Sequence, residues 1–207
     1  MSTLPTFPGK DPTQAEFWNQ RFAAQFMPWD KGGVPQDLQE FVRLAKQPMA
    51  TLIPGCGIGY EAAFLAQSGW DVTAIDFSPA AVASARAAIG EWGKHVIEAD
   101  FFQYQPAQRL DLIYERAFLC ALPPAMRSAI ARRWAALLPA GGILAGFFFL
   151  DECAERSLKG PPFSITAADL QALLLPYFEL QEQRAASDSI PVFVGKESWQ
   201  VWRRRSD

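Results

Sequence analysis

Short apolar runs alternate with helical patterns through most of the chain, and this alternation restricts the fold more than any other feature of the sequence. Five runs have the length and composition of buried strands, at 49–53, 70–75, 95–99, 110–114 and 143–150. The last of them is apolar throughout, which is typical of a central strand covered by helices on both faces. Strands separated by helices predict an α/β fold with a parallel, doubly wound sheet and right-handed crossovers.

Helical patterns occupy the intervals between the runs, at 61–68, 78–89, 123–137 and 167–175. Their starts carry capping residues: Ser78 precedes Pro79, and Thr166 is followed three residues later by Asp169. The segments 178–183 and 199–203 alternate apolar with polar residues instead, which predicts an exposed hairpin at the sheet edge. Together these elements predict a seven-stranded, mostly parallel sheet with an antiparallel terminal hairpin.

Composition favours one soluble domain. The chain has 207 residues, of which 50% are hydrophobic and 20% charged, with a net charge of −3. This is enough to build one apolar core, and we expect a single domain over 1–207, with its α/β core at 49–205. Four proline or glycine residues in 1–14 indicate a mobile arm.

Charge and hydropathy disfavour nucleic-acid binding, membrane insertion and secretion. A mildly acidic chain whose one basic run is Arg203-Arg204-Arg205 gives little attraction to nucleic acid. The longest apolar run, at 141–150, is half the ~20 residues of a membrane-spanning helix, and residues 1–10 do not resemble a secretory signal. We therefore expect a cytoplasmic monomer with neither a nucleic-acid nor a membrane partner.

Cysteine and histidine usage limits the chemistry. Cys56, Cys120 and Cys153 are odd in number and far apart, which is neither a disulfide framework nor a zinc spacing, so we expect a reducing compartment and no metal. The one histidine, His95, stands at the head of a predicted strand. We favour a structural role for it over a catalytic one.

A glycine-rich loop follows the first predicted strand, where α/β folds bind nucleotides. Gly55, Gly57 and Gly59 permit positive φ and close approach of the backbone to a ligand. Tyr60 takes the place of the third glycine of a dinucleotide fingerprint, and the Lys-Ser/Thr of a P-loop is missing. Asp76 ends the second strand, where a carboxylate can accept hydrogen bonds from ribose hydroxyls.

The G-x-G-x-G spacing and the placed acid resemble class I S-adenosylmethionine-dependent methyltransferases, which have a Rossmann-like sandwich with helices on both faces of the sheet. Asp100 and Phe101, at the end of the third strand, fit this resemblance, which implies that they contact the adenine.

From about residue 16 to 205, the chain resembles the thiopurine and thiol S-methyltransferase family more closely. The segments that carry this resemblance are Phe17-Trp18, Pro28 to Gly33, Pro54 to Glu61, Tyr114 to Ala117, Ala121 to Pro124 and Gly160 to Phe163. The resemblance implies S-adenosylmethionine as cofactor and a small-molecule methyl acceptor. It also implies that residues 1–33 cover the cofactor, through Trp18 and Trp29, with Asp30 fixing the segment.

The remaining predicted site residues lie on the acceptor side. Arg116 follows the fourth strand and is the predicted catalytic and acceptor-binding residue; a salt bridge to Glu115 or another carboxylate is the alternative role. Glu115 is assigned to the cofactor. Phe22 stands where thiol-methylating members often have Trp, and Phe163 is expected to form an apolar wall. Gly160-Pro161-Pro162-Phe163 resembles the N-methyltransferase Pro-Pro motif, but Gly160 lacks the acidic or amide side chain and the segment follows the fifth strand.

The sequence thus predicts methyl transfer to a soft nucleophile, which can be a thiol, thiopurine, halide, or selenium or tellurium compound. A thiol with a pKa near 8.5 is partly ionised at neutral pH, so no dedicated base is required. Two alternatives stay open: a nucleotide-dependent oxidoreductase, and a protein that binds the cofactor without turnover.

Overall fold

The structure is a computed structural model that describes residues 5–153 and 160–206. One seven-stranded sheet runs through it in the order β3-β2-β1-β4-β5-β7-β6. The five parallel strands are β1 (Thr51–Pro54), β2 (Val72–Asp76), β3 (Val96–Glu98), β4 (Leu112–Arg116) and β5 (Ile143–Phe149). The antiparallel pair β6 (Phe178–Ala185) and β7 (Glu197–Arg204) completes the sheet. The predicted architecture is confirmed.

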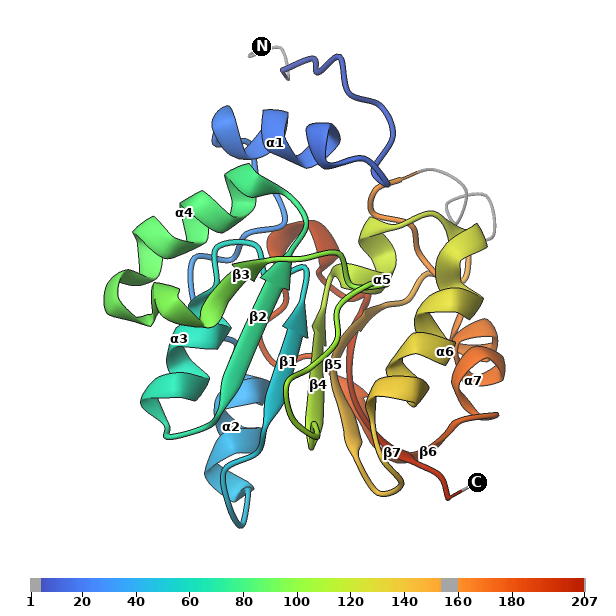
Figure 1. Ribbon diagram of the computed structural model, residues 1–207. Helices are drawn as coiled ribbons and strands as arrows, with labels where there is room; N and C mark the ends of the chain where they lie inside the picture. Colours follow the sequence, from blue (N-terminus) through green and yellow to red (C-terminus); the bar gives the residue numbers. More distant parts are fainter. Residues whose placement is uncertain (1–4, 154–159, 207) are drawn as a thin grey trace.

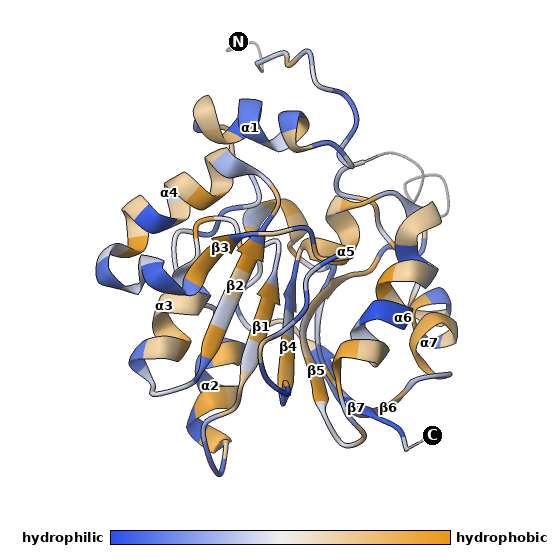
Figure 2. Ribbon diagram, in the orientation of Figure 1, coloured by the Kyte–Doolittle hydropathy of each residue, from blue (hydrophilic) through white to orange (hydrophobic). Residues whose placement is uncertain are grey.

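Helices cover both faces of this sheet (Figure 1). On one face lie α2 (Gln36–Leu44), α3 (Tyr60–Gln67) and α4 (Pro79–Ile89); on the other lie α5 (Phe118–Ala121), α6 (Arg127–Leu137) and α7 (Ala167–Leu174). Helix α1 (Ala15–Ala23) lies instead across the carboxyl ends of the parallel strands. Figure 2 shows hydrophobic residues along the parallel strands, as expected when both faces are covered.

Two apolar cores result, one on each side of the sheet. Trp134 of α6 is fully buried in the first, and Leu65 of α3 in the second. Alternation along β4 divides its residues between them, since Ile113 packs in the first core while Leu112 and Tyr114 pack in the second. The same alternation decides which β4 side chains can reach the functional site.

The predicted caps form. Ser78 Oγ accepts a hydrogen bond from Ala81 N at 3.1 Å, and Thr166 Oγ1 accepts one from Asp169 N at 3.0 Å. Ser78 also ties α4 to α1, because its hydroxyl donates to Asn19 Oδ1 at 2.7 Å.

Several local predictions differ from the structure, and one helix was not predicted. Strand β7 is buried, because it lies between β5 and β6, so β6 is the only strand of the predicted hairpin that lies at a sheet edge. Strand β4 begins two residues later than predicted, so Arg116 ends the strand. The turn at 124–126 is a 3-10 helix, and α6 starts after it. Helix α2 was not predicted, although Leu38, Phe41 and Val42 stand at helical spacing and pack in one core.

The predicted arm spans residues 1–14, of which 1–4 lie outside the described part. Residues 5–14 contain no helix or strand, as predicted. Two hydrogen bonds hold the arm against α1, from Gly9 N to Gln20 Oε1 at 2.9 Å and from Trp18 Nε1 to Pro12 O at 2.8 Å. Helix α1 ends before Phe26, whose ring packs on Phe7 of the arm. Across the described residues, none of the helices is long and apolar enough to span a bilayer.

Candidate functional site

A cavity of about 490 Å³ lies at the carboxyl ends of β1, β2 and β4. Residues of α1 and of the segment that follows it also line this cavity. Open α/β sheets bind ligands at this edge, next to the switch point where the strand order reverses between β1 and β4. Nine of the predicted site residues line it: Trp18, Phe22, Trp29, Gly55, Gly57, Gly59, Asp76, Phe101 and Arg116.

The glycine loop joins β1 to α3 and requires glycine for two different reasons. Gly55 has a φ of +61°, and a Cβ there would lie 2.8 Å from Cδ2 of Phe118. Gly57 has a φ of +56°, but a Cβ on it would meet no atom within 4 Å. The first glycine is therefore needed for packing, and the second leaves its backbone open to the cavity.

Asp76 ends β2 beside this loop and is 8% exposed. Its carboxylate accepts hydrogen bonds from Ser78 N at 2.9 Å and from Gly57 N at 3.4 Å. Burial raises the pKa of Asp76 to about 6, although these backbone N–H groups favour the ionised form. The side chain is thus mostly ionised at pH 7, with lone pairs left to accept hydroxyl groups of a ligand.

Three aromatic side chains from the N-terminal segment line the cavity. Trp18 and Trp29 pack edge to face with ring centroids 5.5 Å apart, and Phe22 lies 6.2 Å from Trp29. Next to Trp29, Asp30 accepts a hydrogen bond from Gly32 N at 2.8 Å, within its own turn. Indole faces beside a cavity suit a cationic ligand.

Arg116 enters the cavity from the end of β4. Its guanidinium carbon lies 4.6 Å from the centroid of Phe147, and its Nε lies 3.9 Å from Glu61 Oε1. Both Nη atoms are buried, and neither has a hydrogen-bond partner among residues 5–153 and 160–206. The side chain is therefore fixed along one edge and keeps two donors for an anionic or polar group.

Three predicted site residues lie outside the cavity lining. Asp100 is exposed, and its Oδ1 accepts a hydrogen bond from Phe102 N at 2.9 Å. Glu115 is buried and is the neighbour of Tyr114 and Arg116 on β4, so its side chain leaves the opposite face of the strand. Phe163 is buried against Gly160, behind the wall that Gly160, Pro161 and Pro162 form. The structure therefore does not bring these three side chains to the ligand space.

Glu115 instead caps α5. Its Oε1 accepts a hydrogen bond from Leu119 N at 2.7 Å, while Oε2 is buried without a partner in the described chain. Burial, together with the nearby Glu197 carboxylate, raises the pKa of Glu115 to about 8, although the hydrogen bond from Leu119 N favours the ionised form. The carboxyl group is mostly protonated at neutral pH.

Glu115→Gln should make stability less dependent on pH. A pKa near 8 in the folded chain, against 4.5 in the unfolded chain, means that the wild type loses stability as pH rises between these values. Glutamine can still accept from Leu119 N but carries no proton to lose. We expect the melting temperature of the variant, relative to wild type, to rise steadily from pH 5 to pH 9. Glu179→Gln, at an exposed site on β6, is the control. If the melting temperatures of wild type and Glu115→Gln changed with pH in the same way, the raised pKa of Glu115 would be contradicted.

Other lining residues were missed by the sequence analysis or were not given a role. Glu61 and Tyr114 stood in recognised motifs, yet only the structure shows that both face Arg116's side of the cavity. Lys10, Arg21, Ile190, Val192 and Phe193 also line it. They carry no motif, because loops far apart in the sequence bring them together.

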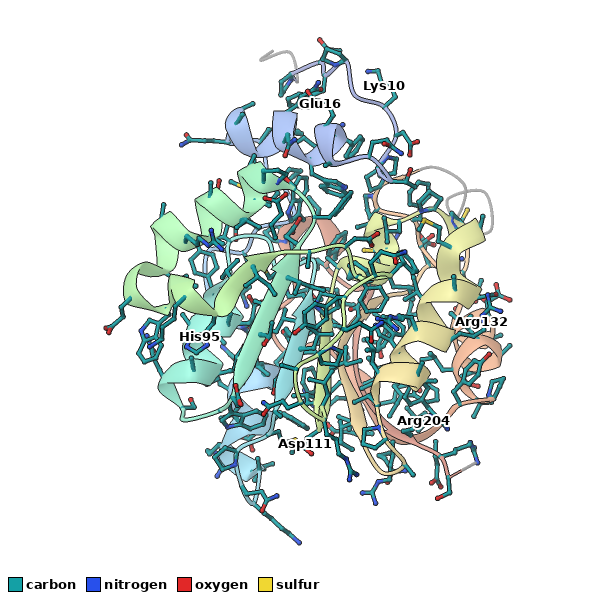
Figure 3. All side chains as sticks on the ribbon, viewed as in Figure 1. Lys10, Glu16, His95, Asp111, Arg132 and Arg204 are labelled. Atoms are coloured by element: carbon teal, nitrogen blue, oxygen red, sulfur yellow. The ribbon has the colours of Figure 1, made fainter. Side chains whose placement is uncertain are left out.

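His95 lies far from the cavity, near the amino ends of the strands (Figure 3). Its Nδ1 is 3.0 Å from Val72 O, and its ring stacks on Trp92. This placement favours the structural role. Within the described ranges, no three His, Cys, Asp or Glu side chains are grouped so as to hold a metal ion.

The sheet order, the helices on both faces and the cavity at the glycine loop define a class I S-adenosylmethionine-dependent methyltransferase fold. A solved structure with this fold is Burkholderia thailandensis 1,6-didemethyltoxoflavin-N1-methyltransferase with bound 1,6-didemethyltoxoflavin and S-adenosylhomocysteine. The two structures superpose with a TM-score of 0.74 over 98% of this chain and 94% of that chain, at 16% identity.

The family model of Thiopurine S-methyltransferase (TPMT) matches residues 13–206, and the chain belongs to this family. It is 30% identical over 164 residues to "Probable thiol methyltransferase 2" of Arabidopsis thaliana, covering 77% of this chain and 71% of that protein. It is also 27% identical over 193 residues to "Thiocyanate methyltransferase 1" of the same organism, covering 90% and 84%. The protein is an S-adenosylmethionine-dependent methyltransferase, as predicted.

Proposed function

We propose that the protein transfers a methyl group from S-adenosylmethionine to a small, soft, anionic nucleophile, with a thiolate as the leading acceptor. The observation that carries this proposal is the guanidinium of Arg116, whose two buried Nη atoms have no hydrogen-bond partner in the described chain and stand in the same cavity as the glycine loop. A buried pair of free donors is costly unless a ligand uses them. An anionic acceptor satisfies both.

The residues present fit the cofactor. The open backbone at Gly57 leaves space for the amino-acid part, and the Asp76 carboxylate can accept the ribose hydroxyls. Phe101 offers an apolar surface for the adenine ring, and Trp18 and Trp29 offer their faces to the sulfonium. When bound, the cofactor supplies an electrophilic methyl group. Asp100 is left without a role in this proposal, because its carboxylate is exposed and bonded to its own turn.

The protein's contribution is mostly positioning. Arg116 holds the acceptor as an anion, and the aromatic cover with Phe22 excludes water from it. Glu61 lies beside the Nε edge of Arg116 and orients the guanidinium. A thiol needs no strong base because it is already partly ionised near neutral pH. We propose in addition that the protein acts in the cytoplasm as a monomer.

Calorimetry and a turnover panel test this function. We expect S-adenosylhomocysteine to bind and NADH not to bind, because the loop lacks the third glycine of a dinucleotide site. The panel contains hydrosulfide, thiophenol, a thiopurine, thiocyanate and iodide, with methyl transfer followed by S-adenosylhomocysteine release. Binding of NADH alone would support an oxidoreductase. A folded, cofactor-bound protein that methylates none of the five would support a binding protein without turnover.

A further inference from the structure

The acceptor side of the cavity is bounded by the loop that precedes α7. Gly160, Pro161 and Pro162 line the cavity, while Phe163 and Ser164 are buried behind them. A Cβ on Gly160 would lie 2.6 Å from Cγ of the Phe163 ring. This contact leaves no free space between the two residues, so the position of Phe163 determines where the lining part of the loop lies.

Hydrogen bonds with two helices, α5 and α6, hold the backbone at Phe163 in place. Its backbone N–H donates to Cys120 O of α5 at 2.7 Å. On the other side, Arg127 Nη2 donates to Ser164 O at 2.6 Å and to Phe163 O at 3.3 Å. The Arg127 side chain thus donates to two consecutive backbone carbonyl groups of buried residues. Without it, these carbonyl oxygens would be buried without a hydrogen bond, which destabilises the loop.

Arg127 itself does not line the cavity. It is the first residue of α6 and is half-buried, and its Nε is buried without a hydrogen-bond partner in the described chain. Burial lowers the pKa of its guanidinium, and Asp169 of α7 opposes this change. Partial burial of this charged group is unfavourable unless hydrogen bonds compensate for it, and the two bonds to the loop carbonyls provide that compensation.

We propose that Arg127 is a positioning residue that fixes the acceptor wall of the cavity, so that the wall can hold acceptors large enough to reach it. The proposal rests on the proposed methyl-transfer function and adds a residue that determines specificity. Arg127 acts through Phe163 on Gly160 and touches neither acceptor nor cofactor. Its loss should therefore affect acceptors that reach the wall and spare those too small to reach it.

Three variants separate this role from a general effect on the fold. Arg127→Met removes the donors but keeps an apolar stem of similar reach. Arg127→Lys restores a positively charged donor group for the two carbonyls, without the planar guanidinium. The matched control is Arg132→Met, the same substitution on the same helix, at an exposed side chain that points away from the sheet (Figure 3).

The first measurement needs no turnover. In the S-adenosylhomocysteine complex, the Phe163 amide should exchange its hydrogen at least about tenfold faster in Arg127→Met than in wild type, since loosening the loop exposes that hydrogen bond. Arg127→Lys should lie between the two, and Arg132→Met should match wild type. Equal exchange at Phe163 in Arg127→Met and Arg132→Met would overturn the proposal.

The second measurement compares acceptors of two sizes. For thiophenol, Arg127→Met should raise KM about tenfold and Arg127→Lys should recover part of the loss; for hydrosulfide, KM should stay within about twofold of wild type. Affinity for S-adenosylhomocysteine should be unchanged in all variants. Equal KM changes for both acceptors would overturn the proposal. Absence of turnover by wild type would instead contradict the proposed function, and the exchange of Phe163 would still decide the role of Arg127.

Discussion

Asp76→Ala is expected to weaken S-adenosylhomocysteine binding by about tenfold to a hundredfold, because hydrogen bonds to a charged group contribute about 1.5–3 kcal/mol. The carboxylate ends β2 at the cavity and has lone pairs beyond those used by Ser78 N and Gly57 N. Stability should change little, because a buried carboxylate whose pKa is raised to about 6 gains nothing from being charged in the folded chain. Calorimetry gives the affinity, and thermal melting gives the stability.

The pH dependence of binding gives an independent check on Asp76. Since the ionised form accepts hydroxyl hydrogen bonds better, affinity in the wild type should fall as pH drops through about 6. Asp76→Asn should show no such fall. Asp71→Ala is the control, since Asp71 directly precedes the amino end of the same strand and is exposed. A variant that melts far below wild type but binds normally per folded molecule would assign Asp76 to structure.

Arg116→Ala is expected to lower kcat/KM for thiolate acceptors by about a hundredfold while leaving cofactor affinity within about twofold. Alanine removes the two buried Nη donors that are free to hold the acceptor as an anion. It also removes a cation that lies over the ring of Phe147, so some loss of stability should accompany the loss of activity. Initial rates over a range of acceptor concentrations, with saturating cofactor, measure the effect.

Arg116→Lys distinguishes geometry from charge. Lysine keeps the positive charge but has no planar fork that can be fixed along one edge by Glu61, so we expect it to recover only part of the activity. Full recovery would mean that charge alone matters. An unchanged rate in Arg116→Ala would confine the residue to its contacts with Glu61 and Phe147.

Local signals made much of the fold predictable. Ser78 and Thr166 cap their helices as expected, because capping depends on a few neighbouring residues. The glycine loop and Asp76 line one cavity because parallel strands bring their carboxyl ends to one edge. These features depend only on short segments and on one general rule of sheet topology, so they can be predicted from a single sequence.

Strand register was less predictable. Placing the fourth strand two residues early left the direction of the Glu115 side chain undetermined, and the structure turns it away from Arg116. The alternation in β7 suggested exposure, but that strand is inserted between β5 and β6 and is buried on both faces. Phe163 directly follows residues that line the cavity, and yet its ring packs behind Gly160. Such details depend on contacts between distant segments.

The bond between Asn19 and Ser78 joins the covering helix to the turn that follows Asp76. Binding at that turn and docking of the helix are therefore linked, and linkage is reciprocal: a ligand that steadies one steadies the other by the same free energy. A ligand that binds beside Asp76 and stabilises this turn would thereby also stabilise the docked position of the helix over the cavity.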